Sequence, residues 1–172
     1  INRIFAISSG IGFDAAACAV SPHPKLKSVL NHLKLGRLTY LLNALYCLFH
    51  RTSAGVQVII DNQLTIKRPD FLFCVSMIQN YEGGGFPFCP TSVNNDGYLD
   101  VCLVDGIKKR HAMYLLPLAL FGRHVTSRFV RRYRGKTITL KTTEPLYVHA
   151  DGEVLGQFSN ITVSLEGTLR IL

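Results

Sequence analysis

Asp151-Gly152 lies between two short runs of strand-forming residues, Tyr147-Val148-His149-Ala150 and Val154-Leu155-Gly156. Asp and Gly both tolerate the positive φ values of a two-residue type I′ turn, so the sequence predicts a β-hairpin here. Similar runs follow one another through the last forty residues, at Thr137–Thr142, Leu146–His149, Ile161–Leu165 and Thr168–Ile171, with turn residues at Glu144-Pro145, Ser159-Asn160 and Glu166-Gly167. This part of the chain is therefore expected to consist of short antiparallel strands.

The preceding residues predict more strands and a few helices. Strands are expected at Ile4–Ser8, Val56–Ile60, Leu64–Lys67, Phe71–Ile78 and Tyr98–Val104, and helices after the glycine turn Gly10-Ile11-Gly12, over Gly36–Arg51 and over Lys109–Phe121, with Pro22-His23-Pro24 ending the first. A chain of 172 residues suits one domain, here residues 1–172. The expected fold is mainly β, a β-sandwich with accessory α-helices.

Two apolar segments, Leu38–Phe49 and Ala112–Phe121, fall short of the roughly 20 residues that span a bilayer, so both are expected to be core helices. The five cysteines are odd in number and include no C-x-x-C pair. They are interpreted as buried free thiols of a protein in a reducing compartment. Because the chain begins with Ile1 rather than Met, we expect it to be part of a longer protein.

The charge of the chain is strongly basic and unevenly distributed. Its net charge is +8, and two stretches, Ala15–Ile60 and Gly106–Thr143, contain no Asp or Glu. Such a field attracts anionic partners, namely nucleic acid, an anionic lipid surface or a phosphorylated substrate, although a basic solvated face with no dedicated partner is the alternative. No nucleic-acid-binding signature accompanies the basic residues, so nucleic acid is not expected.

Asp151 and Glu153 place two carboxylates at the tip of the predicted hairpin. One carboxylate there could take a proton from an attacking hydroxyl while the other orients it or helps to hold a metal ion. The alternative is that Asp151-Gly152 serves only as a turn.

Two further segments could bind ligands. Asp96, Asp100 and Asp105 surround a predicted strand and could hold Mg²⁺ or Ca²⁺, or could serve as turn and strand-end residues. Gly83-Gly84-Gly85 could present N–H groups to an anion, but no Gly-Lys-Ser/Thr follows as in a P-loop, and a simple surface loop explains it equally well.

Four segments together resemble the C-terminal domain of the diacylglycerol kinase family, in particular its bacterial lipid kinase branch, which is related to sphingosine and ceramide kinases. They are Gly10-Ile-Gly-Phe-Asp-Ala15, Asn80-Tyr-Glu-Gly-Gly-Gly-Phe86, Pro90-Thr-Ser-Val-Asn-Asn-Asp-Gly-Tyr-Leu-Asp-Val101 and His149-Ala-Asp-Gly-Glu153. The resemblance implies the second domain of a two-domain kinase, in which an N-terminal domain binds ATP through a Gly-Gly-Asp-Gly-Thr motif. That motif is absent from this chain.

The resemblance also implies roles for individual residues. Asp151 matches the general base that takes the proton of the lipid hydroxyl, and Glu153 matches a carboxylate that supports Mg²⁺. A structural Mg²⁺ site of bacterial members would use Asp96 and the Tyr98 carbonyl, but its third position is Val93, which has no carboxylate. Gly83-Gly84-Gly85 would contact the cofactor, which is ATP with Mg²⁺.

The resemblance gives the basic residues a partner, the anionic surface of a membrane. The set expected to make that contact is Arg123, Arg128, Arg131, Arg132, Arg134 and Lys136. The expected enzyme phosphorylates a lipid at the inner face of the cytoplasmic membrane, together with the ATP-binding domain of the same protein and with a homodimer as a further possibility. The alternatives are an NAD-kinase-like enzyme domain and a non-catalytic β-domain that binds anionic membranes.

Overall fold

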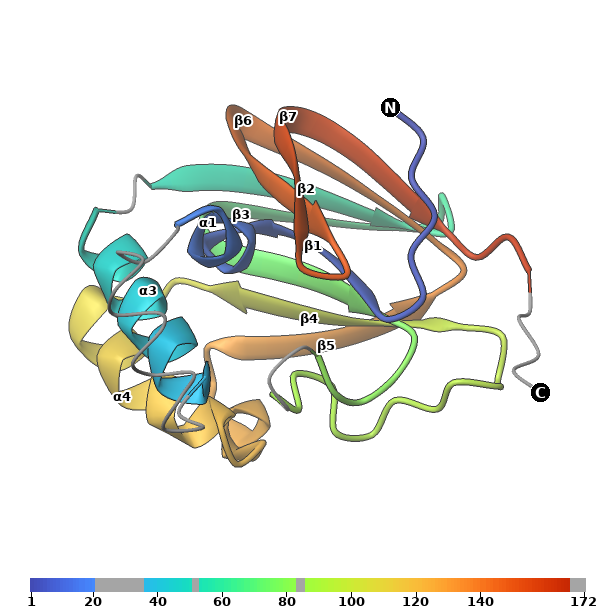
Figure 1. The fold of residues 1–172 in the computed structure, drawn as a ribbon. Coiled ribbons are helices and arrows are strands. Elements are labelled where there is room, and N and C mark those ends of the chain that lie inside the picture. Colours follow the sequence, from blue (N-terminus) through green and yellow to red (C-terminus); the bar gives the residue numbers. More distant parts are fainter. Residues whose placement is uncertain (21–35, 51–52, 83–85, 168–172) are drawn as a thin grey trace.

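The structure, a computed structural model, describes residues 1–20, 36–50, 53–82 and 86–167. Its strands are β1 (Ser8–Gly12), β2 (Ala54–Ile60), β3 (Leu64–Met77), β4 (Leu99–Asp105), β5 (Val130–Gly135), β6 (Thr137–Ala150) and β7 (Glu153–Ser164). Its helices are α1 (Phe13–Ala19), α3 (Gly36–His50) and α4 (Lys109–Ala119), and a 3-10 turn η1 covers Arg123–Thr126. The mainly β fold with accessory helices that the sequence predicts is confirmed (Figure 1).

The strands pair antiparallel in the order β1-β6-β2-β3-β4-β5, and β7 pairs with β6. β1 pairs with β3 as well as with β6, so β1, β3, β2 and β6 close into a ring. The length of β3 makes this possible, because its first half pairs with β2 and its second half with β1 and β4. A register shift between Phe71 and Phe73 marks the change of partner, as expected where a strand bends from one layer of a sandwich into the other.

Alternation along β3 and β4 separates two apolar cores. On β4, Val101 and Leu103 face the interior of the ring of strands, whereas Cys102 and Val104 face the helices. Successive strand residues point to opposite faces, so a central strand with apolar residues on both faces is buried on both sides. The helices α3 and α4 lie side by side at one end of the molecule, and α1 lies closer to the strands (Figure 1).

Several boundaries differ from the sequence predictions. Glu144-Pro145 and Ser159-Asn160 are not turns, because β6 and β7 continue through them and only the pairing is interrupted between Lys141 and Leu146. Pro145 has no N–H to give to a ladder, so an interruption of the pairing tolerates it. Leu64–Lys67 and Phe71–Ile78 join into the single strand β3. Thr168–Ile171 and Pro22-His23-Pro24 lie outside the described residues.

The prediction of a strand at Ile4–Ser8 is wrong, because β1 begins at Ser8 and runs through Gly10 to Gly12. The predicted glycine turn before a helix is found at Gly12, whose φ of 102° lets the chain pass directly from β1 into α1. Gly10 has a different use, the close approach described below.

The helix predictions hold more closely. α3 covers the predicted range as far as His50, with Arg51 outside the described residues, and α4 begins where it was predicted to begin. No helix in the described ranges is long and apolar enough to cross a membrane. All five cysteines are free thiols as predicted; Cys47, Cys74, Cys89 and Cys102 are buried and Cys18 is half-buried.

Candidate active site

The hairpin predicted at Asp151-Gly152 is confirmed. Ala150 pairs with Glu153 across a two-residue turn, and both turn residues have positive φ values, 52° at Asp151 and 81° at Gly152. These are the values of a type I′ turn. The Asp151 amide also donates to the Ser8 carbonyl at 2.8 Å, so the turn is tied to the start of β1.

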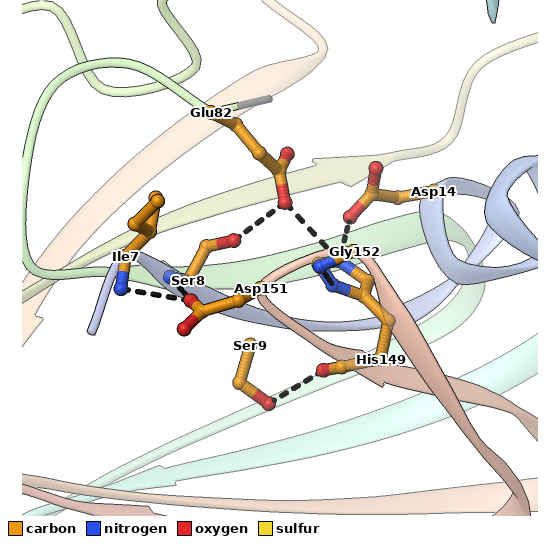
Figure 2. Close-up of polar contacts among 8 residues, drawn as sticks. All are labelled: Ile7, Ser8, Ser9, Asp14, Glu82, His149, Asp151 and Gly152. Carbon is orange, nitrogen blue, oxygen red and sulfur yellow. Dashed lines mark hydrogen bonds and ion pairs between the residues drawn. The ribbon is translucent and has the colours of Figure 1, made fainter. Parts of the chain in front are cut away.

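The Asp151 carboxylate receives three backbone N–H groups. Oδ2 accepts from Ala6 at 2.8 Å, and Oδ1 accepts from Ile7 at 2.8 Å and from Ser8 at 3.0 Å. A carboxylate offers about four lone-pair positions, so one position on Oδ2 stays open. Asp151 is therefore held in a fixed orientation at an exposed position, and it can still accept one more proton or hydrogen bond (Figure 2).

Beside Asp151 lies a cluster of titratable side chains that three distant segments supply. His149 Nε2 lies 2.7 Å from Asp14 Oδ2 and 3.4 Å from Glu82 Oε1, and the Ser8 hydroxyl donates to the same oxygen of Glu82. Asp14 comes from the first turn of α1, Glu82 follows β3, and His149 lies near the end of β6 (Figure 2). The side chains of His149 and Asp14 are buried, and that of Glu82 is 9% exposed.

The Gly152 amide determines how His149 carries its proton. This N–H donates to His149 Nδ1 at 3.2 Å, so in a neutral ring the proton resides on Nε2 and is donated to Asp14. Burial alone would lower the pKa of His149, but the charges of Asp14, Glu82 and Asp151 and the hydrogen bond to Asp14 raise it to about 9. In the neutral and the charged ring alike, Nε2 carries a proton toward Asp14.

Glu82 is the other group in the cluster whose titration is displaced. Burial and the charge of Asp14 raise the pKa of Glu82 to about 7, against the lowering influence of His149 and of the Ser8 hydroxyl. Its Oε2 is buried and has no hydrogen-bond partner among the described residues. An orphaned carboxylate oxygen of this kind is costly unless a further group meets it.

Asp14, Glu82 and His149 have ligand atoms within 4.8 Å of one another, and this invites a test as a metal site. His149 Nε2 carries a proton toward Asp14 in the neutral and the charged ring alike, so it has no lone pair to offer a metal ion. The nitrogen therefore does not fit a metal ion in this geometry. The carboxylate oxygens of Asp14 and Glu82 do fit one, because Mg²⁺ prefers oxygen ligands and Glu82 Oε2 is unmet.

Gly10 on β1 leaves the space in which Asp14 and His149 meet. A Cβ atom at this position would lie 2.4 Å from Asp14 Oδ2 and 2.5 Å from His149 Nε2. Any side chain here would separate the two hydrogen-bonded atoms, so the first glycine of the Gly-Ile-Gly-Phe-Asp segment is required by space.

Other residues that the sequence singled out lie elsewhere. Glu153 is exposed and pairs with Arg3, so it does not reach the cluster. Gly83-Gly84-Gly85 lies outside the described residues, although the flanking residues Glu82 and Phe86 form an isolated bridge.

Asp96, which with Tyr98 was predicted to hold a metal ion, has partners for both carboxylate oxygens in this structure. Asp96 Oδ1 accepts the Tyr98 N–H at 3.0 Å, and Oδ2 pairs with the guanidinium of Arg134. Arg134 Nε also lies 3.6 Å from Asp100 Oδ1. An arginine therefore pairs with the Asp96 carboxylate, and Val93 is exposed and has no ligand group.

Much of the predicted membrane-contact set is engaged within the protein. Arg131 pairs with the buried carboxylate of Asp105, Arg132 donates to Thr91, and Arg134 pairs with Asp96. Arg128 lies over the ring of Phe129 and Lys136 over that of Tyr98, whereas Arg123 is exposed in η1. The alternation of β5 also places Arg131 on the opposite face from Arg132 and Arg134.

An apolar cavity of about 30 Å³ lies beside the cluster, between the strands and α4. Its lining residues are almost all apolar: Phe13, Leu72, Phe73, Phe86, Phe88, Val104, Ala112, Leu115, Leu116 and Ala119, together with Asp14 and His124. Asp14 therefore faces this cavity and the polar cluster at once.

Asp14, Glu82 and His149 were not among the predicted site residues, although each falls in one of the segments that carry the family resemblance. Their common feature is tertiary, because the chain separates Asp14 from His149 by 135 positions. No spacing rule could have joined them; only the pairing of β1 with β6 does so.

A known family model and several named proteins match this chain. Residues 9–172 match the model of the YegS C-terminal NAD kinase beta sandwich-like domain. The chain is 28% identical over 162 residues to "Putative lipid kinase YtlR" of Bacillus subtilis, covering 94% of this chain and 52% of that protein. It is 26% identical over 118 residues to a protein of Mycobacterium tuberculosis named diacylglycerol kinase, covering 69% of this chain and 38% of that protein.

Solved structures share the fold. A crystal structure described as a putative diacylglycerol kinase from Bacillus anthracis aligns with a TM-score of 0.66 at 21% identity, over 94% of this chain and 51% of that one. A second diacylglycerol kinase structure from the same organism aligns with a TM-score of 0.55 at 16% identity, over 95% of this chain and 47% of that one. The chain thus spans about half the length of these relatives.

Proposed function

The chain belongs to the family of YegS C-terminal NAD kinase beta sandwich-like domains, and from this membership we propose that it is the substrate-facing part of an ATP-dependent lipid kinase. The reaction transfers the γ-phosphate of ATP to a lipid hydroxyl. The names of the relatives, lipid kinase and diacylglycerol kinase, motivate this reaction. ATP is bound mainly by a further domain of the parent protein, and the chain alone is inactive.

One observation carries the proposal, namely that an apolar cavity and a polar cluster share Asp14. A lipid presents a hydroxyl beside an apolar tail, so its site needs these two environments in contact. The tail would lie along the cavity lining with its hydroxyl toward Asp14 and Asp151. At about 30 Å³ the cavity is narrow, so the tail enters by displacing the half-buried Leu115 and Leu116 of α4.

In this reaction we assign to Asp151 the role of general base. Its carboxylate is oriented by three N–H donors and has one open position on Oδ2, which is what the removal of a proton from a hydroxyl requires. His149 holds Asp14 through its Nε2 proton and is tied to the Asp151 turn through the Gly152 N–H. His149 is thus a positioning residue. Glu153, paired with Arg3, is given no direct role.

Mg²⁺, when bound with ATP, neutralises the charge on the phosphate oxygens during transfer. The residues that fit it are Asp14 and Glu82, because Glu82 Oε2 is buried without a partner among the described residues. Asp96 and Tyr98 are not proposed as metal ligands, since Arg134 takes that carboxylate.

The apolar lining of the cavity favours a lipid over a soluble nucleotide as substrate, and therefore favours lipid kinase over the NAD-kinase-like alternative. The enzyme would act at the inner face of the cytoplasmic membrane with an anionic lipid surface as partner. Diacylglycerol is the first lipid to test, because it is the substrate that the names of two relatives imply.

The test uses the full-length protein that contains this chain, incubated with labelled ATP, Mg²⁺ and vesicles carrying diacylglycerol or other lipid alcohols. We expect label in an organic-soluble phospholipid. Label transferred to NAD and to no lipid would replace the proposal with the NAD-kinase-like alternative, and absence of any transfer would leave a non-catalytic binding domain.

A further inference from the structure

α4 carries an exposed apolar stripe on the side that faces away from the cavity. Met113, Tyr114 and Pro117 are exposed on the helix, and Phe121 follows one turn beyond Pro117. Tyr114 is 72% and Phe121 75% exposed. Arg110, Tyr114 and Pro117 recur at the i, i+4, i+7 spacing of one helix face, and the exposed Phe121 lies in the turn just past the end of the helix.

Basic residues stand at both ends of this stripe. Arg110 is exposed at its start, and Arg123 is exposed in η1 just past Phe121. The neighbouring helix α3 adds Leu42, Tyr46 and Phe49, which are also exposed. The two helices are joined where Lys109 Nζ donates to the Phe49 carbonyl at 2.7 Å.

Neither helix brings a carboxylate to this end of the molecule. α3 lies within the acid-free stretch Ala15–Ile60 and α4 within the acid-free stretch Gly106–Thr143, and the two helices lie side by side (Figure 1). The nearest acid before α4 in the chain is Asp105, which is buried and paired with Arg68 and Arg131. The two helices themselves therefore combine exposed aromatic side chains with basic side chains and no carboxylate. Asp70 lies beside the end of α3 and the start of α4, where its carboxylate accepts from the Ser53 hydroxyl and its carbonyl from the Gly106 N–H.

We propose that this stripe, defined as Arg110, Met113, Tyr114, Phe121 and Arg123, docks the protein on an anionic lipid bilayer. Aromatic side chains insert at the headgroup level while flanking cations meet anionic lipids. A second copy of the same face would oppose positive charge with positive charge, so self-association is disfavoured.

The position of α4 also supports a bilayer as the partner of the stripe. This support rests on the proposed function, in which the cavity beside α4 binds a lipid tail. The inner side of the helix lines the apolar cavity through Ala112, Leu115, Leu116 and Ala119. A bilayer against the outer side would be separated from the cavity by one helix. A lipid tail could then pass from membrane to cavity without crossing water.

Vesicle sedimentation of the full-length protein tests the docking without reference to activity. Vesicles of phosphatidylcholine with phosphatidylglycerol are compared with vesicles of phosphatidylcholine alone. The Arg110→Gln/Arg123→Gln variant should bind the anionic vesicles more weakly by about fivefold for each arginine. The Tyr114→Ser/Phe121→Ser variant should lose binding by about tenfold or more. The matched control is Leu64→Ser/Val93→Ser, which removes two exposed apolar side chains outside the helices and should bind as wild type.

A fluorescence reporter distinguishes the occupants of the stripe. The chain contains no Trp, so Phe121→Trp adds emission that is read against the parent protein. Emission that shifts to the blue only when anionic vesicles are added supports the proposal. Emission already blue-shifted without vesicles would mean that another part of the protein covers the stripe, and would overturn it. The proposal would also be overturned if the wild-type protein bound a short oligonucleotide but no vesicles, and the arginine variant lost that oligonucleotide binding.

Activity separates this inference from the proposed function. If the stripe variants lose vesicle binding and phosphorylate a vesicle-embedded lipid slowly but a detergent-dispersed short-chain lipid normally, both stand. If the stripe variants lose vesicle binding but the wild-type protein phosphorylates no lipid, the docking is supported and only the proposed kinase activity is contradicted. Unchanged vesicle binding in the Tyr114→Ser/Phe121→Ser variant would overturn the docking whatever the activity.

Discussion

His149 is the residue that connects the parts of the site. Its Nε2 reaches Asp14 and Glu82, and its Nδ1 accepts the N–H of Gly152 in the turn that carries Asp151. Because both ring nitrogens are used, the ring cannot rotate without breaking one of these contacts. The orientation of Asp151, the proposed general base, and that of the buried carboxylates are therefore coupled through one imidazole.

The raised pKa of His149 predicts how stability depends on pH. The folded protein holds the proton up to a pKa of about 9, against 6.5 for an ordinary histidine. The folded state then binds more protons than the unfolded state between these values, so the free energy of unfolding falls as pH rises from about 6.5 to about 9. We expect a loss on the order of 2 kcal/mol over this window. This loss is smaller than the full pKa difference would give, because in the charged ring the Nδ1 proton faces the Gly152 N–H.

Urea unfolding of wild type and His149→Gln at several pH values measures this slope. Gln keeps a donor for Asp14 but does not titrate, so its slope should be shallower. His124→Gln is the matched control, because His124 is also buried and burial lowers its pKa, which places its titration below this window. Identical slopes in wild type and His149→Gln would contradict the assignment.

At the scale of elements, β1 is the strand that brings the site together. It pairs with β3 on one side and with β6 on the other, and it leads directly into α1, whose first turn carries Asp14. Gly10 stands where β1 passes closest to the Asp14–His149 contact. The strand can occupy this place only because that residue has no side chain.

Gly10→Ala should therefore separate Asp14 from His149. We expect a loss of stability of roughly 1–3 kcal/mol, as for other insertions into packed sites, together with a loss of lipid kinase activity. Gly55→Ala in β2 is a suitable control, since a Cβ there meets the Thr143 methyl at 3.1 Å and the Arg68 and Pro69 carbonyl oxygens only at ordinary contact distances of 3.4 and 3.5 Å. Chemical denaturation and the kinase assay measure the two effects. Full activity in Gly10→Ala would show that the contact is dispensable.

The sequence predicts the local elements well and the long ones poorly. The Asp151-Gly152 turn and helix α3 were found because their signals are local, namely turn chemistry and helical periodicity. β6 was divided at Glu144-Pro145 because a turn-like pair usually ends a strand. Here it coincides with an interruption of the pairing with β7, which only the partner strand reveals.

The same distinction applies to the site. The turn that carries Asp151 could be predicted because its signal is local, whereas Glu82, Asp14 and His149 meet only in the folded chain. The metal prediction at Asp96 and Tyr98 depended on the family resemblance and on local carboxylate spacing. That spacing does not show that Arg134, from the neighbouring strand β5, pairs with the same carboxylate.

At the scale of the whole molecule, the helical end and the ring of strands have different roles in the proposed function. The strands hold Asp151 and His149 in place, and α4 separates the apolar cavity from the exposed stripe. The long strands β3 and β6 extend through the domain and fix this arrangement.

Narrowing the cavity tests its proposed role in binding the lipid tail. Ala112 is buried and lines the cavity from α4. Ala112→Val adds two methyl groups to this space, so kcat/KM for a long-chain diacylglycerol should fall by about tenfold, equivalent to ~1.4 kcal/mol. The value for a short-chain substrate should change little. Ala44→Val on α3 serves as control, because Ala44 is buried in the same apolar core without lining the cavity. Equal losses for long and short chains would argue against a tail in this cavity.

The most direct test of the central claim is the rate of phosphate transfer to lipid by full-length Asp151→Asn. The amide keeps one oxygen for the Ile7 and Ser8 N–H groups and leaves the Ala6 N–H without its acceptor, so the fold should lose only about 1 kcal/mol of stability. If Asp151 is the general base, turnover should fall by about a hundredfold or more in this folded variant. Turnover within a few-fold of wild type would show that Asp151 is a turn anchor and that the proton leaves by another route.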